Sequence, residues 1–202
     1  MPVRVPLTPY DRLFLAGHLA LREQSLPGHP ILAILDLHGP LDSAELSGRF
    51  ETAMARHPLL TSHIGYSRLT GRAHWRLDGP ASTRSRPIIR QYDLSATADP
   101  EAERETLLRR LLNESLDPET PPHVRLHHVR FSEDRHALVL HYGHYLMDLH
   151  GGWRLLREMA TASTGAAEST PDYARLLQAS RSRPHEWTGG RLRRWAQGVR
   201  QH

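Results

Sequence analysis

The segment ALVLHYGHYLMD, residues 137–148, ends an apolar run with a histidine that an aspartate follows four residues later. The run itself, residues 137–142, has the length and composition of a buried strand. Residues 151–159, which follow, space their apolar side chains as an amphipathic helix does. The segment therefore places His144 and Asp148 in the connection between a buried strand and a helix.

The composition sets limits on what this chain can be. With 202 residues, 39% of them hydrophobic, it can bury a real core, in one or at most two compact units. No cysteine is present, which excludes disulfides, thiolate metal sites and a thiol nucleophile. All 26 basic residues are arginine, so lysine Schiff-base and P-loop chemistry are excluded as well. We find no signal-peptide pattern and no apolar stretch of about 18 residues, and we expect a cytoplasmic protein without a membrane span.

The net charge is +4, and arginines are dense near the end of the sequence. They are Arg181, Arg183, Arg191, Arg193, Arg194 and Arg200. Because neither a nucleic-acid-binding module nor interleaved aromatic residues accompany them, we expect no nucleic-acid partner. A solvated basic helix face is the simpler interpretation, and binding of an acidic partner such as a carrier protein is the alternative.

Local signals indicate an alternation of helices and strands. Residues that favour helix starts stand at Thr8-Pro9, Asp42 and Asp99-Pro100. Strands are expected at residues 31–37, 62–67, 71–77 and 87–92, and a hairpin at 123–131 and 135–142. This order predicts an α/β (α+β) protein, with a mixed β-sheet flanked by helices.

The residue pattern of the connection resembles the His-His-x-x-x-Asp-Gly signature of the condensation-domain and chloramphenicol-acetyltransferase-like acyltransferases. His144 matches its second histidine and Asp148 its aspartate. Residues 7–15, which include Arg12, resemble the family's opening motif, in a form similar to that of wax-ester and polyketide-associated acyltransferases. Residues 56–60 and 171–174 resemble two further family segments, in the family's order.

The resemblance implies a role for each matched residue. His144 would be the general base of acyl transfer, a task that suits an imidazole with a pKa near 7. Arg12 and Asp148 would form a buried ion pair that supports the His144 loop. The alternative for Asp148 is a surface position that caps the following helix.

Two positions depart from the family signature. Gly143 stands in place of the first histidine, and Leu149 in place of the glycine. Gly143, Leu149 and Tyr145 are our candidates for the lining of a substrate tunnel. A leucine at position 149 could alter the turn that orients His144 or block the acyl channel.

The resemblance covers only the first half of the family's fold. It implies an acetyltransferase-like N-terminal lobe at residues 1–165, with a crossing segment and C-terminal helices at 166–202. Because the family's active-site tunnel lies between two lobes, a second lobe would come from a homo-oligomer or from a separate subunit.

The function implied is acyl transfer from a thioester to an amine or alcohol, in the biosynthesis of nonribosomal peptides, other natural products or lipids. The thioester, on a phosphopantetheine carrier protein or on CoA, would be a substrate, and we expect no tightly bound cofactor. The alternative is a non-catalytic half-domain that docks a carrier protein or pairs with a full enzyme. The other histidines of this region lack the spacing of a zinc site, and we expect no metal; they are His123, His127, His128, His136, His141 and His150.

Overall fold

The computed structural model describes residues 3–77 and 88–161. In chain order the elements are β1 (Val3–Pro6), α1 (Pro9–Glu23), β2 (Pro30–His38), α2 (Ser43–Arg56), the 3-10 helix η1 (Pro58–Thr61), β3 (His63–Tyr66), β4 (Ala73–Leu77), β5 (Ile88–Asp93), α3 (Pro100–Leu112), β6 (Val124–Arg130), β7 (Arg135–Gly143) and α4 (Leu149–Thr161). The predicted boundary at residue 165, the segment 166–202 and the match at residues 171–174 lie outside the described residues.

The larger sheet has four strands in the order β2-β7-β6-β5. The β6–β7 hairpin forms as predicted and is antiparallel, with Leu126 opposite Leu140. β2 pairs antiparallel with β7, whereas β5 pairs parallel with β6. The sheet is therefore mixed, and the predicted fold class is confirmed.

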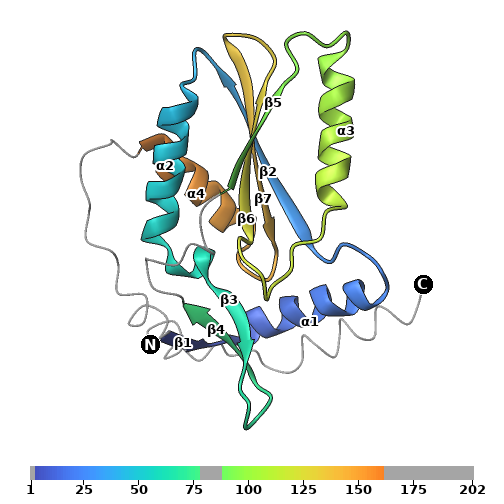
Figure 1. Cartoon of the computed structure of the whole chain (residues 1–202), viewed down its shortest axis with the longest axis vertical. Helices are drawn as coiled ribbons and strands as arrows, with labels where there is room; N and C mark the ends of the chain where they lie inside the picture. The colour runs from blue at the N-terminus through green and yellow to red at the C-terminus, as the bar shows by residue number, and fades with distance from the viewer. Residues whose placement is uncertain (1–2, 78–87, 162–202) are drawn as a thin grey trace, which may run out of the picture. The chain divides into compact units, whose positions relative to one another are not determined.

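Helices cover both faces of this sheet (Figure 1). On one face, α2 and α4 bury Phe50, Met54 and Leu156 against Leu140 and other apolar residues of the strands. On the other face, α3 buries Leu107 and Leu111 against strand residues. Strand β7 is buried along nearly its whole length because both of its faces are covered, which explains its continuous apolar sequence.

The helix starts follow the predicted capping signals. Thr8 caps α1, and its hydroxyl and the Asp11 carboxylate exchange hydrogen bonds with each other's backbone N–H. Asp42 caps α2, and Asp99 caps α3. None of the described helices is both long and apolar enough to cross a membrane.

A smaller sheet, β1-β4-β3, connects to α1. Strand β1 is not predicted from the sequence. It pairs antiparallel with β4, which places Val5 opposite Trp75. The Trp75 indole N–H then donates to the Asp11 carboxylate at 3.2 Å, so the smaller sheet is tied to the first turn of α1.

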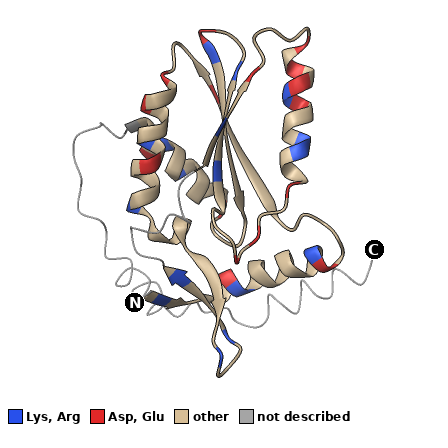
Figure 2. Ribbon diagram, in the orientation of Figure 1, with Lys and Arg blue, Asp and Glu red and all other residues tan. Residues whose placement is uncertain are grey.

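Charges of both signs lie along α3, where they pair with each other and with neighbouring elements (Figure 2). Arg109 pairs with Glu105 one turn away at 2.9 Å, and Arg104 pairs with Asp36 of β2 at 2.9 Å. This helix therefore presents no uniformly basic surface.

Candidate functional site

His144 lies directly after β7, in the turn that leads to α4. Its ring stacks on that of Phe14 from α1, with centroids 3.9 Å apart and planes 22° apart. Tyr10, one turn earlier on α1, has its ring centroid 6.4 Å from that of His144. The backbone N–H of His144 donates to the His29 carbonyl at 2.8 Å. The strand end, α1 and the segment before β2 thus hold the residue from three sides.

The ring nitrogens of His144 have no hydrogen-bond partner among the described residues. The residue is half-buried; its Nδ1 is buried and has no hydrogen-bond partner. Within residues 3–77 and 88–161, neither ring nitrogen forms a hydrogen bond. A neutral imidazole carries one proton and one lone pair on these two atoms. No protein group in the described part of the chain therefore competes for the lone pair.

Tyr145 belongs to the core of the described lobe, and its assignment to the lining of a tunnel stays a prediction. Its side chain is 1% exposed, and its hydroxyl is hydrogen-bonded to His123 Nδ1 at 3.2 Å. The ring also meets His18 edge-on, at 4.8 Å between centroids. This side chain is therefore enclosed within the lobe.

Gly143 is enclosed in the same way, and it is required by Tyr145. A Cβ atom at position 143 would lie 2.3 Å from Tyr145 Cε1, far inside van der Waals contact. The Tyr145 ring therefore covers the space into which a side chain at position 143 would project. Leu149, in contrast, is 50% exposed at the start of α4, and a lining role for it stays a prediction.

Comparison with solved structures matches this architecture to condensation domains. The first condensation domain of the calcium-dependent antibiotic synthetase, in complex with a substrate analogue, matches with a TM-score of 0.74 at 23% identity, over 90% of this chain and 44% of that one. The starter condensation domain of rhizomide synthetase also matches with a TM-score of 0.74, at 16% identity, over 89% of this chain and 44% of the other. This chain has the fold of a condensation-domain lobe.

The fold that the resemblance implies is thus confirmed. The tallysomycin biosynthesis protein TlmII matches with a TM-score of 0.64 at 24% identity, over 77% of this chain and 34% of that one. No protein-family profile matches the sequence, and no curated protein does. The chain spans less than half the length of the condensation-domain structures it matches.

The ion pair expected between Arg12 and Asp148 is not formed in this lobe. Asp148 is exposed, and its Oδ1 accepts a hydrogen bond from the Gly151 N–H at 2.8 Å. Arg12 is exposed too, and its guanidinium donates to the Leu7 carbonyl at 3.2 Å. Asp148 therefore caps α4, which is the alternative that the sequence left open. The cap is favoured over the ion pair because the Asp148 carboxylate reaches the N–H of Gly151, three residues later, while it stays exposed. A buried ion pair would instead require two charges to leave water.

We predict that the two residues differ in their effects on stability. Asp148→Ala should lower the free energy of unfolding by about 0.5–2 kcal/mol, through loss of the cap. Arg12→Ala should change it by less than about 0.5 kcal/mol, as is usual for an exposed residue outside any such feature. Urea denaturation of both variants measures this. Equal losses of several kcal/mol would instead indicate a buried ion pair.

Buried histidines are a feature of this lobe that sequence analysis missed. His18, His123, His127 and His141 are each at most 1% exposed. Burial is the main reason that the pKa falls to about 4 in His18, His123 and His141, and to about 3 in His127. All four are therefore neutral at pH 7. No group of three or more His, Asp or Glu among the described residues is arranged to hold a metal ion.

The elements beside the His144 turn expose large apolar side chains. On α1 these are Tyr10, 46% exposed, and Leu13, 67% exposed. On α4 they are Leu149 and Trp153, which is 43% exposed. Exposed apolar surface of this kind often marks a place where another protein or a ligand binds.

Proposed function

We propose that this chain is one lobe of a condensation-type acyltransferase, in which His144 is the general base. It would transfer an acyl group from a thioester, carried by CoA or by a carrier protein, to an amine or an alcohol. The observation that carries the proposal is the position of His144: a half-buried imidazole at the end of β7, with no hydrogen bond to either nitrogen, in a condensation-domain fold. In addition, a starter condensation domain of this fold has been solved in complex with C8-CoA.

The proposed reaction needs one proton to be moved. As the amine or hydroxyl attacks the thioester carbonyl, a C–N or C–O bond forms and the imidazole takes the proton of the nucleophile. When the tetrahedral intermediate collapses, the C–S bond breaks and the imidazolium returns this proton to the thiolate. General-base catalysis of this kind contributes roughly 10²- to 10⁴-fold.

The geometry favours Nε2 of His144 as the basic atom. Phe14 covers a face of the ring, and Nδ1 is buried without a partner. A substrate that approaches from outside the lobe would therefore meet the opposite edge of the ring. Stacking on Phe14 also limits the rotation of the imidazole, so that its lone pair keeps one direction as the reaction proceeds.

A second lobe would complete the site. The chain covers 44% of a condensation domain, and Tyr10 and Leu13 expose apolar surface on the helix that holds His144. Covering this surface would exclude water from the proposed base. Either a second copy of the chain or a separate subunit could supply the cover. Sedimentation velocity, with the chain alone and mixed with candidate subunits, measures which of these forms.

The non-catalytic half-domain remains the second candidate, since two observations favour it. Gly143 stands where the family signature has its first histidine, and Asp148 does not pair with Arg12. If the chain only docks a carrier protein, it should bind the acylated carrier without consuming the thioester.

The test is an acyl-transfer assay with the full chain. Octanoyl-CoA is incubated with amine or alcohol acceptors, at chain concentrations that span any self-association. We expect release of free CoA that depends on the acceptor, and an acylated acceptor in the mass spectrum. Binding of thioester or carrier protein, without product under any of these conditions, would support the docking function and contradict the acyltransferase.

A further inference from the structure

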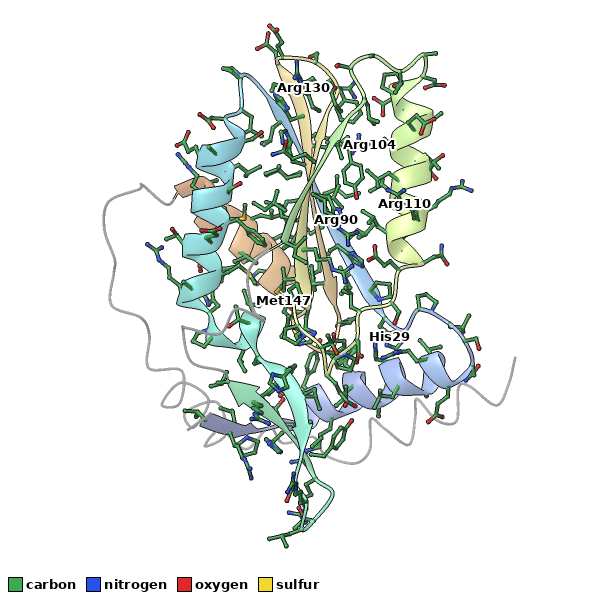
Figure 3. All side chains as sticks on the ribbon, viewed as in Figure 1. His29, Arg90, Arg104, Arg110, Arg130 and Met147 are labelled. Atoms are coloured by element: carbon green, nitrogen blue, oxygen red, sulfur yellow. The ribbon has the colours of Figure 1, made fainter. Side chains whose placement is uncertain are left out.

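A chain of hydrogen bonds runs from a buried side chain of α1 to the backbone of His144. His18 is 1% exposed, and its Nδ1 accepts a hydrogen bond from the His29 backbone N–H at 3.2 Å. The carbonyl of the same residue, His29, accepts the hydrogen bond from the His144 N–H at 2.8 Å. His29 lies where the connection from α1 reaches β2 (Figure 3). The imidazole of His18 is therefore joined to His144 through a single intervening residue.

Steric contacts fix the same connection. Gly28 has a φ of +89°, and a Cβ atom there would lie 2.3 Å from His18 Nδ1. The His18 ring therefore lies directly against the backbone of Gly28. On the other side of the connection, the His29 ring packs so closely on α1 that a Cβ at Gly17 would be 3.0 Å from its Cε1. The segment before β2 thus packs on α1 at two places, Gly28 on the His18 ring and the His29 ring on Gly17.

His18 also contacts the residue that follows His144. The rings of His18 and Tyr145 meet edge-on at 4.8 Å, and the Tyr145 hydroxyl is anchored by His123. His18 consequently acts on the His144 turn at two points, through the backbone of His29 and through the ring of Tyr145. The hydrogen bond from His29 needs an unprotonated Nδ1, and burial keeps the imidazole neutral by lowering the pKa of His18 to about 4.

We propose that His18 is a positioning residue for His144, holding the backbone on which the proposed base is mounted. The catalytic part of this inference rests on the proposed function of His144. The hydrogen-bonded link from His18 through His29 to His144 does not depend on it. Displacement of a reacting group by about 1 Å can cost on the order of 10²-fold in rate. Loss of the His18 acceptor should therefore lower kcat, with little effect on KM.

The test compares three replacements of His18. Asn places a carbonyl oxygen near the position of Nδ1, Gln places it near that of Nε2, and Leu has no acceptor. One readout is the titration of the His144 ring by NMR, assigned with a His144→Gln variant. The other is acyl-transfer kinetics. The matched control is His127→Leu, which removes an equally buried histidine whose Nδ1 contacts Tyr92 instead.

We expect His18→Leu and His18→Gln to shift the His144 ring signals and their titration midpoint, and to lower kcat by about 10- to 100-fold. In His18→Asn, the His144 ring signals and kcat should both stay close to those of the parent. His127→Leu should lower the melting temperature without moving the His144 signals. The inference is overturned if all three His18 variants leave the His144 titration as it is in the parent, or if His127→Leu shifts it equally.

Two further outcomes separate this inference from the proposed function. If the parent transfers no acyl group while the NMR pattern is as expected, the positioning link stands and the acyltransferase fails. If His18→Leu does not fold, the comparison of Asn with Gln decides, because these two amides differ by a single methylene group that changes where the acceptor is placed. Equal His144 titrations in these two variants would then contradict the link.

Discussion

Restoration of the family histidine at position 143 should destabilise this protein. A Cβ atom there would lie 2.3 Å from the ring of Tyr145, which is fully buried and hydrogen-bonded to His123. Gly143→Ala already forces that ring to move, and overpacking of this kind costs about 1–3 kcal/mol. Gly143→His adds a larger side chain, and loss of the Tyr145–His123 hydrogen bond adds about 1–3 kcal/mol for the polar group left unsatisfied.

Urea denaturation of Gly143→Ala, Tyr145→Leu and the double variant measures this effect. In the Tyr145→Leu background the added methyl group no longer meets the edge of the tyrosine ring. We therefore expect the two changes to be coupled by about 1 kcal/mol or more. Gly48→Ala is the matched control: a Cβ there meets nothing within 4 Å, on an exposed face of α2. It should stabilise the protein by about 0.5–1 kcal/mol. A Gly143→Ala variant at least as stable as the parent would contradict the proposed packing.

Acidification from pH 7 to pH 5 should remove several kcal/mol from the free energy of unfolding. In the folded lobe, burial lowers the pKa of His18, His123 and His141 to about 4, and that of His127 to about 3. In the unfolded chain their pKa is about 6.5. Between these values the unfolded state binds more protons than the folded state. The contribution of these histidines to the free energy of unfolding is therefore complete above about pH 6.5, and it is lost as the pH decreases toward 4.

The slope of this loss can be measured residue by residue. Each fully buried neutral histidine contributes up to about 1.4 kcal/mol per pH unit in this window. Urea denaturation at pH 8, 7, 6 and 5 should show a steep decrease below pH 6.5. His127→Gln should make the decrease shallower, because about one proton fewer is taken up on unfolding. His150→Gln, at an exposed position, should leave the slope unchanged. An unfolding free energy that stays constant from pH 7 to pH 5 would show that these histidines are not buried as neutral groups.

Local signals in the sequence were sufficient to predict most of the elements. Thr8 and Asp42 begin helices because their side chains accept backbone hydrogen bonds within three residues, which a sequence shows directly. The β6–β7 hairpin also depends on neighbours in the sequence. Strand β1, in contrast, is stabilised by β4, roughly seventy residues later, and its four residues carry no signal of that pairing.

The candidate site could be predicted only in part. The motif pointed to His144 at a strand end, and the structure places it there. The sequence could not show that Tyr145 turns inward beneath Gly143, because this depends on the space left between α1 and the smaller sheet. It also could not choose between the two roles of Asp148, since one Asp can cap a helix or pair with a distant Arg. The nearby Gly151 N–H decides the matter in the folded lobe.

The acyl-transfer rate of His144→Ala relative to the parent tests the role of His144 most directly. The ring is half-buried and its nitrogens form no hydrogen bonds in the described chain, so its removal should cost little stability. We predict a rate loss of at least about 10²-fold, in line with the loss of a general base, with an unfolding free energy within about 1 kcal/mol of the parent. A variant that keeps activity within a few-fold of the parent would contradict the assignment of His144 as the base.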